Sequence, residues 1–304
     1  MELEQSSSAA SAGGFEFTPE FLRKLERLEW MTRRILRGQI RGEQRTRRLG
    51  RSIELYDYRA YQHGDDLRYV DWNLYSRLDQ LFVKLFAAEE DLTLHLLVDA
   101  SASMALGTPS KLDHCRHLAA ALAYVGLNRF ERVGITGFSD HVTARLAPLR
   151  GRRNLPRALD FLSALQASSR TQLAPSITEF CEGEQRRGLV VVLSDLLDAG
   201  DVLAGLRHLR QHRHDVTVLH ILAEEDITAA LSGDLLLVDS ESGAELRLSM
   251  DEGLRDRALG HFTADLETLQ RALSRAGIGY ARASTAVPFE DVILRYMREG
   301  QLLR

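Results

Sequence analysis

Residues 96–104 read LLVDASASM, an apolar run that ends in Asp99, Ser101 and Ser103. Two further residues resemble them in chemistry and setting. Asp195 ends a second apolar run, GLVVVLSD, and Thr171 lies in the polar segment SSRTQL before a predicted helix. The five residues supply two carboxylates and three hydroxyls, the hard oxygen ligands that Mg²⁺ and Mn²⁺ prefer. The set has no imidazole or thiolate, so zinc is not expected there.

The elements that would position these residues alternate between strand and helix from residue 92 onward. Strands are predicted at TLHLLVDAS, RVGITGF, GLVVVLSD, DVTVLHIL and IGYARA, with HVTARLAPL a candidate for another. Apolar residues at helical spacing predict helices over 112–125, 155–165, 173–181, 202–209, 251–276 and 288–299. The fold class predicted is α/β, a doubly wound and mostly parallel sheet of Rossmann type. The insertion GDLLLVDSESGAELRLS predicts an antiparallel hairpin that turns at Ser242–Gly243.

This architecture explains how the five residues could meet. Asp99 would end the central first strand, and Asp195 would end a later strand of the same sheet. Ligands of doubly wound sheets bind beyond the carboxyl ends of the strands, where the strand order reverses. We therefore expect Asp99, Ser101, Ser103, Thr171 and Asp195 to converge at one edge. The alternative is that Asp99 and Ser101 only cap the helix that follows.

The N-terminal third has a different character. Residues 1–14 are small and polar and are predicted to be disordered. Thr18, Pro19 and Glu20 predict the start of a helix that runs to about residue 36. Residues 38–91 hold short alternating runs such as SIELYDY and QLFVKLF, typical of strands and loops. The predicted organisation is a tail (1–14), a helix with a β-rich segment (15–91) and the α/β domain (92–304).

Composition favours a soluble globular protein. Of the 304 residues, 44% are hydrophobic and 27% charged, and the formal net charge is −4. The first residues lack a basic-then-apolar signal peptide, and no apolar run approaches the roughly 18 residues of a membrane helix, so a cytoplasmic protein is expected. Cys115 and Cys181 are predicted to be two buried thiols in a reducing compartment.

Several enzyme classes lack their motifs. The sequence contains no GxxxxGK[ST] phosphate loop and no Gly-x-Ser-x-Gly elbow, and residue 101 is a serine where a haloacid-dehalogenase phosphatase needs a second aspartate. His208, His212 and His214 cluster in RHLRQHRHD, but no HExxH glutamate lies between the first two. We therefore predict a solvated helix end there, and a chain that is not an enzyme.

The spacing of the oxygen ligands resembles a known family. Thr171 follows Asp99 by 72 residues, and Asp195 follows Thr171 by 24. This pattern is similar to the metal-ion-dependent adhesion site of von Willebrand factor A domains. The resemblance implies that Mg²⁺ (or Mn²⁺) is held by the three hydroxyls, and by Asp99 and Asp195 directly or through water. A carboxylate from a protein partner would complete the coordination shell.

A second resemblance covers almost the whole chain, from about Gly38 to Met297. The segment 56–77, YDYRAYQHGDDLRYVDWNLYSR, is followed by VKLF and the acidic AAEED. Together with the hairpin LLLVDSESGAELRL and the C-terminal helix containing Phe289, it resembles a bacterial von Willebrand A-like family, domain of unknown function 58 (DUF58). The resemblance implies an adaptor or chaperone partner of an AAA+ ATPase of the MoxR type.

The segment 56–77 itself allows two interpretations. It is rich in residues that form ion pairs and aromatic contacts, with a turn predicted at Gly64–Asp65–Asp66: Tyr58, Arg59, Tyr61, Asp65, Asp66, Arg68, Asp71, Trp72 and Arg77. These residues could form a structural latch onto the sheet, since arginine pairs with carboxylates and stacks on rings. They could equally form a partner surface, because Tyr, Trp and Arg are enriched at binding hot spots.

The basic stretch 23–51 supports an alternative function, association with nucleic acid. It holds eleven Lys or Arg residues against three Glu. Trp30 is its only aromatic residue, which is few for a groove that stacks single-stranded bases. We therefore expect this stretch to face an acidic surface of the protein or of a protein partner, and expect nucleic acid less.

Overall fold

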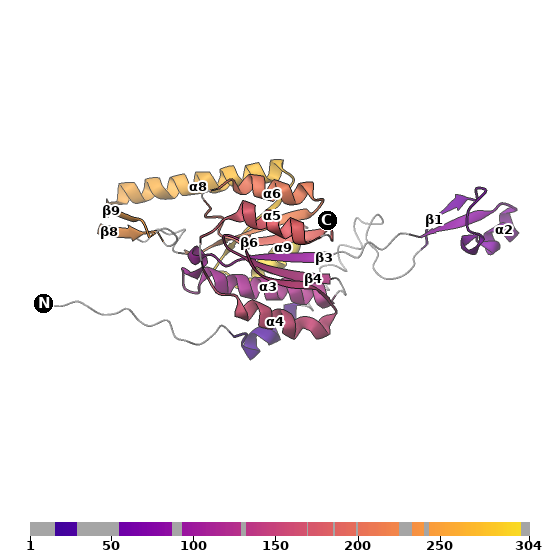
Figure 1. Cartoon of the computed structure of the whole chain (residues 1–304), viewed down its shortest axis with the longest axis horizontal. Coiled ribbons are helices and arrows are strands. Elements are labelled where there is room, and N and C mark those ends of the chain that lie inside the picture. Colours follow the sequence, from indigo (N-terminus) through magenta and orange to yellow (C-terminus); the bar gives the residue numbers. More distant parts are fainter. Residues whose placement is uncertain are drawn as a thin grey trace. The chain divides into compact units, whose positions relative to one another are not determined.

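The computed structural model describes residues 16–28, 55–86, 93–128, 132–168, 170–184, 186–198, 200–224, 233–239 and 243–298 (Figure 1). The chain divides into two compact units. One comprises residues 36–91, and the other comprises residues 1–35 together with residues 92–304. The predicted disordered tail lies outside the described residues.

The larger unit is built on a six-stranded sheet with the order β10-β7-β6-β3-β4-β5. Its strands are β3 (Thr93–Asp99), β4 (Arg132–Phe138), β5 (Val142–Arg150), β6 (Gly188–Ser194), β7 (Asp215–Leu222) and β10 (Gly279–Ser284). All neighbours pair in parallel except β5, which pairs antiparallel with β4. The predicted mostly parallel α/β sheet is confirmed, and HVTARLAPL is indeed a strand.

The position of β3 follows from its composition. Every residue of TLHLLVD is buried, as expected for a strand covered on both faces of a parallel sheet. The chain moves outward from β3 to β4 and β5, then crosses back to place β6 on the other side of β3. The strand order therefore reverses between β3 and β6.

Helices cover both faces of this sheet (Figure 1). The connecting helices are α3 (Lys111–Asn128), α4 (Leu155–Ala164), α5 (Leu173–Gly183), α6 (Val202–Gln211), α8 (Glu252–Arg275) and α9 (Phe289–Arg298), with 3-10 turns η2 (Ala102–Ala105) and η3 (Arg152–Asn154). Helices α5, α6 and α8 lie on one side, where Ile177, Leu206 and Leu273 join a core with Val190 and Val192. Helices α3, α4 and α9 lie on the other side.

The N-terminal helix is described over residues 19–28 and packs on that second side. Thr18 Oγ1 accepts a hydrogen bond from the Phe21 N–H at 3.1 Å, which confirms the predicted cap. The Phe21 ring contacts His117 of α3 and Phe289 of α9, with centroids 4.8 and 4.9 Å away. This helix therefore groups with the sheet, whereas the sequence analysis grouped it with residues 38–91.

The predicted hairpin is present as β8 (Gly233–Val238) paired antiparallel with β9 (Glu245–Met250). Gly243 lies in its connection with φ 69°, in the left-handed region that favours glycine. Ser242, the other residue of the predicted turn, lies outside the described residues.

The smaller unit contains β1 (Leu55–Ala60) and β2 (Phe82–Phe86), an antiparallel pair, with η1 (Leu67–Tyr69) and α2 (Trp72–Leu78) between them. Only strands and loops were predicted here, so helix α2 corrects that prediction. Its cause is local: the Asp71 carboxylate accepts the N–H groups of Asn73 and Leu74 at 2.9 and 3.2 Å and starts the helix.

Candidate functional site

Asp99 lies at the carboxyl end of β3, fully buried. Its Oδ1 accepts the Ser101 N–H at 2.9 Å, and its Oδ2 accepts the Ser194 hydroxyl at 2.5 Å. Ser194 ends β6, so this second bond joins the two strands between which the sheet order reverses. Asp99 is thus fixed at the switch point where a doubly wound sheet is expected to bind its ligand.

The two serines of the string lie directly beside this carboxylate. Ser101 is fully buried and Ser103 is 3% exposed, and their hydroxyl oxygens are 3.1 Å apart. Ser101 occupies the cap position of η2, but its side chain makes no capping bond to that turn. The hydroxyl is therefore not committed to a helix start, which was the alternative explanation of the string.

Thr171 belongs to the loop that leads into α5. Two backbone bonds tie this loop to the same edge: Ser168 N–H donates to the Ala100 carbonyl at 2.8 Å, and Gln172 N–H donates to the Ser139 carbonyl at 2.9 Å. Ala100 follows Asp99 directly, so the loop is bound next to the carboxylate. Thr171 itself is 4% exposed.

Asp195 directly follows β6 and is 2% exposed. Its Oδ2 accepts a hydrogen bond from the Lys111 ammonium at 2.7 Å, and its Oδ1 accepts the Leu197 N–H at 3.2 Å. Lys111 is the first residue of α3 and is fully buried. The predicted oxygen cluster thus contains an internal cation that the sequence analysis did not predict.

A histidine fixes the backbone of Asp195 from the neighbouring strand β7. Burial lowers the pKa of His220 to about 4, so its ring is neutral at pH 7. Because a carbonyl only accepts, His220 Nε2–H donates to the Asp195 carbonyl at 2.9 Å, and Nδ1 accepts the Tyr280 hydroxyl at 2.9 Å. Asp195 is held through its main chain as well as its side chain.

The charges of the cluster do not balance. Burial and the nearby carboxylate of Asp195 raise the pKa of Asp99 to about 7. Lys111 supplies one positive charge against two buried carboxylates, so ionised Asp99 remains uncompensated. Together with the hard oxygen donors, this deficit fits a bound cation, since a cation near Asp99 would favour its ionised form.

Two members of the cluster, Lys111 and Ser194, were missed. Lys111 had a usable signal, because a lysine in the first turn of a helix opposes the positive end of the dipole and needs another partner. For Ser194 the sequence offers no signal other than its position directly before Asp195.

Most of the charged and aromatic residues of the segment 56–77 that were singled out form contacts with other residues of the smaller unit. Tyr58 OH donates to Asp71 Oδ2 at 3.0 Å, and Arg59 pairs with Asp65 at 2.9 Å. Arg68 pairs with Asp66 at 2.6 Å, and Arg77 lies in the last turn of α2. Gly64, with φ 106°, precedes Asp65 in the predicted turn. Trp72 is 58% exposed, and its ring contacts that of Tyr75 on the same helix, with centroids 6.2 Å apart.

Most of the basic stretch 23–51 lies outside the described residues. Within the described part, Lys24 pairs with Glu20 at 3.6 Å and with Glu290 of α9 at 3.4 Å. This contact concerns a single residue of the stretch, and the expectation that the stretch faces acidic groups stays a prediction. No helix in the described part of the chain is long and apolar enough to cross a membrane.

Solved structures with similarity to this chain have low sequence identity. The crystal structure of the conserved hypothetical protein BatB from Bacteroides thetaiotaomicron is 14% identical, with a TM-score of 0.44, covering 68% of this chain and 98% of that one. An aerotolerance-related membrane protein from Bacteroides fragilis is 16% identical, with a TM-score of 0.41, covering 69% and 98%.

Sequence relatives are closer. Uncharacterized protein Rv1480 of Mycobacterium tuberculosis and uncharacterized protein Mb1516 of Mycobacterium bovis are each 30% identical over 256 residues, covering 82% of this chain and 80% of theirs. The model of the family described as "protein of unknown function DUF58" matches residues 57–278. This match and these relatives establish that the chain belongs to the DUF58 family.

Proposed function

We propose that this chain is a metal-dependent protein-binding module of the von Willebrand A type, and not an enzyme. One observation carries the proposal: Asp99 and Asp195 are both buried at the carboxyl ends of the adjacent strands β3 and β6, where the strand order reverses. Two buried carboxylates are costly unless a cation compensates them. The five oxygen ligands of the sequence pattern lie on segments bound to this edge.

The residues that would hold Mg²⁺ or Mn²⁺ are Asp99, Ser101, Ser103, Thr171 and Asp195. When bound, the ion supplies a Lewis-acidic position that a partner's carboxylate can occupy. The chain's own part is to hold these oxygens in place. Ser194 and the Ser101 N–H orient the Asp99 carboxylate, and His220 holds the backbone of Asp195.

The loops around this edge favour a protein as the ligand. Leu106, after η2, is 51% exposed, and Leu197, two residues after Asp195, is 54% exposed. Large apolar side chains beside a polar centre are typical of protein-binding surfaces.

A second surface for the same partner is proposed on the smaller unit. Its exposed large side chains come from η1 and α2: Leu67, Tyr69, Trp72, Tyr75 and Leu78. Aromatic residues in such positions are common binding hot spots. From the family resemblance, the partner proposed is an AAA+ ATPase of the MoxR type.

Metal binding is tested by titrating the full chain with Mg²⁺ and Mn²⁺ in a calorimeter. Asp99→Asn removes one of the two carboxylates and is expected to lower the affinity at least tenfold. Asp256→Asn is the matched control, because Asp256 lies on α8 with its side chain 73% exposed. Equal affinities of the parent and Asp99→Asn would contradict the metal site.

The partner is tested by affinity capture with the full chain, with and without EDTA. EDTA and Asp99→Asn should each remove the same captured protein, whereas Asp256→Asn should retain it. If capture survives both treatments, the interaction does not use this edge.

Trp72→Ala separates the two interpretations of the segment 56–77. A partner surface predicts lost capture with unchanged unfolding, since the ring is exposed and its removal opens no cavity. A latch predicts the reverse, a lowered free energy of unfolding with capture retained.

A further inference from the structure

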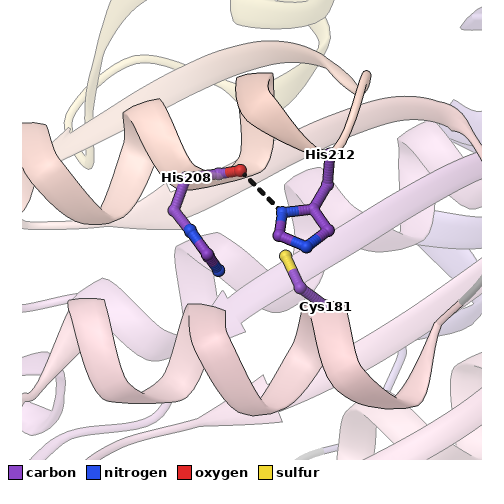
Figure 2. Close-up of side chains that lie close together, drawn as sticks. All are labelled: Cys181, His208 and His212. Carbon is purple, nitrogen blue, oxygen red and sulfur yellow. Dashed lines mark hydrogen bonds between the residues drawn. The ribbon is translucent and has the colours of Figure 1, made fainter.

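We propose that Cys181, His208 and His212 form a second metal site, which binds Zn²⁺ between α5 and α6. The Cys181 sulfur and one ring nitrogen of each histidine all lie within 4.8 Å of one another. Figure 2 shows the Cys181 sulfur directed from its helix toward the two imidazoles of the neighbouring helix. These histidines were predicted to form a solvated helix end, because no HExxH glutamate lies between His208 and His212; Cys181 comes from another helix.

The helix geometry brings the three donors together. His208 and His212 are four residues apart, so they lie on one face of the C-terminal end of α6. Helices α5 and α6 each follow a strand edge and return to the start of the next parallel strand, so they run in the same direction. At Gly205 a Cβ atom would come within 2.9 Å of the Ala174 Cα, which shows how closely the helices approach.

This close contact sets the register of the site. Cys181 lies seven residues beyond Ala174, and His212 lies seven residues beyond Gly205. Seven residues correspond to about 10.5 Å along either helix. The thiol and the imidazole therefore reach the same level of the two parallel helices.

One imidazole is already fixed in a tautomer that can bind a metal. His212 Nδ1 lies 3.0 Å from the His208 carbonyl oxygen (Figure 2). A carbonyl only accepts, so Nδ1 carries the hydrogen and Nε2 keeps its lone pair. A backbone carbonyl bound to the distal nitrogen is the usual support of a metal-binding histidine.

The donor types select the metal. One thiolate and two imidazoles suit zinc and leave a fourth tetrahedral position for water. Donors around tetrahedral zinc are roughly 3.5 Å apart, from bond lengths of about 2.0–2.3 Å. Since the donors lie within 4.8 Å, small side-chain rotations would close the site.

The site is open to solvent at one end and closed at the other. His212 is exposed and His208 half-buried, so an ion can enter from solvent, whereas Cys181 is 8% exposed at the inner end. Burial raises the pKa of Cys181 to about 11, so the metal-free site holds a thiol. Zinc binding would therefore release the thiol proton.

The first experiment titrates the full chain with Zn²⁺ against a competing chelator. We expect His208→Gln and His212→Gln each to weaken binding at least tenfold, because each removes a ligand, and loss of a residue that only supports a ligand already costs about 10–100-fold. His261→Gln is the matched control, because His261 is exposed on α8. Equal affinities in all four proteins, or the same loss in the control, would mean surface binding only and would overturn the proposal.

The second experiment tests the thiol without a substitution in the core. Zn²⁺ should slow alkylation of Cys181 at least tenfold in the parent and have little effect in His212→Gln, measured by peptide mass spectrometry. Cys115, which is fully buried, is the internal reference in the same sample. If Zn²⁺ does not protect Cys181 in the parent, the thiol is not a ligand and the site is wrong.

Discussion

The carboxyl and amino edges of the sheet each have a polar cluster beside them, and the two clusters differ in burial and in the groups they contain. At the carboxyl edge, Asp99 and Asp195 are buried and one of them is paired with the ammonium of Lys111 at 2.7 Å. At the other edge, near the start of β7, His212 is exposed and His208 is half-buried, beside the buried Cys181. The first cluster contains two buried carboxylates that need a compensating cation within the fold, whereas the three members of the second include no carboxylate and no ammonium group.

Because of this difference, the two clusters are expected to affect the stability of the fold to different degrees. A buried carboxylate left without a partner is strongly destabilising, so Lys111 supports the fold whenever no metal is present. The same ammonium is a competitor for a divalent cation, because both are attracted by the same two carboxylates. The Cys181 cluster has no internal competitor of this kind among its three donors. Metal at the carboxyl edge is therefore expected to be coupled to folding energy more strongly than metal at the opposite edge.

The largest predicted effect comes from Lys111→Met. In EDTA the substitution should lower the free energy of unfolding by about 3–5 kcal/mol, the cost of removing one partner of a buried ion pair. Saturating Mg²⁺ should then stabilise the variant more than the parent, because the variant lacks the competing ammonium. Urea unfolding with EDTA and with Mg²⁺ measures both quantities.

The control for this substitution is Lys24→Met. Lys24 is 44% exposed and pairs with the exposed Glu20 and with Glu290, whose side chain is 17% exposed, so its loss should cost less than loss of the fully buried Lys111. If Mg²⁺ stabilises the parent as much as Lys111→Met, Lys111 does not compete with the ion and the two edges do not differ in this respect.

A smaller effect tests burial without a charged partner, at His114 of α3, three residues after Lys111. Burial lowers the pKa of His114 on α3 to about 4, against about 6.5 when unfolded. Its contribution is therefore complete above pH 6.5 and decreases as the pH falls toward 4, because only the unfolded state gains the proton.

Between pH 7 and pH 5 this shift corresponds to about 2 kcal/mol of unfolding free energy. His114→Leu should reduce the pH dependence of urea unfolding by that amount. His261→Leu, at an exposed histidine, should leave it unchanged. A pH dependence that is identical in His114→Leu and the parent would mean that burial alone does not hold this imidazole neutral.

The sequence predicted the fold well where burial dictates composition. The apolar runs LLV of β3 and LVVVL of β6 identified the interior of a parallel sheet, and the polar residues that end them, Asp99 and Asp195, identified its edge. Helix α2 was missed because its start depends on a single cap, Asp71, in a segment with strand-like alternation.

The sites were predictable only where the ligands form a continuous string. Asp99, Ser101 and Ser103 are neighbours in sequence, so their chemistry was evident. Lys111 reaches Asp195 across 84 residues, and such pairings depend on how helices pack. Cys181 meets His208 and His212 only because Gly205 permits close contact of two helices, which periodicity does not encode.

The smallest predicted effect is the coupling between the two edges. Strand β3 has seven residues, so the edges are roughly 20 Å apart at about 3.3 Å per residue. Charges separated by more than the Debye length, about 8 Å at physiological ionic strength, interact weakly when solvent lies between them. Effects at sites this distant usually add within about 0.5 kcal/mol.

The double variant Asp99→Asn with His212→Gln measures this coupling directly. Its Zn²⁺ affinity should equal that of His212→Gln alone, and its Mg²⁺ affinity should equal that of Asp99→Asn alone, each within about twofold, which corresponds to roughly 0.4 kcal/mol. A larger change in either affinity would require a shift of β6 or β7. These strands run from one edge of the sheet to the other and connect the ends of α5 and α6 to Asp195 and its neighbours. Coupling of tenfold or more would therefore show that metal binding at one edge changes metal binding at the other. The two clusters would then not be independent sites, and the contrast drawn between them would be wrong.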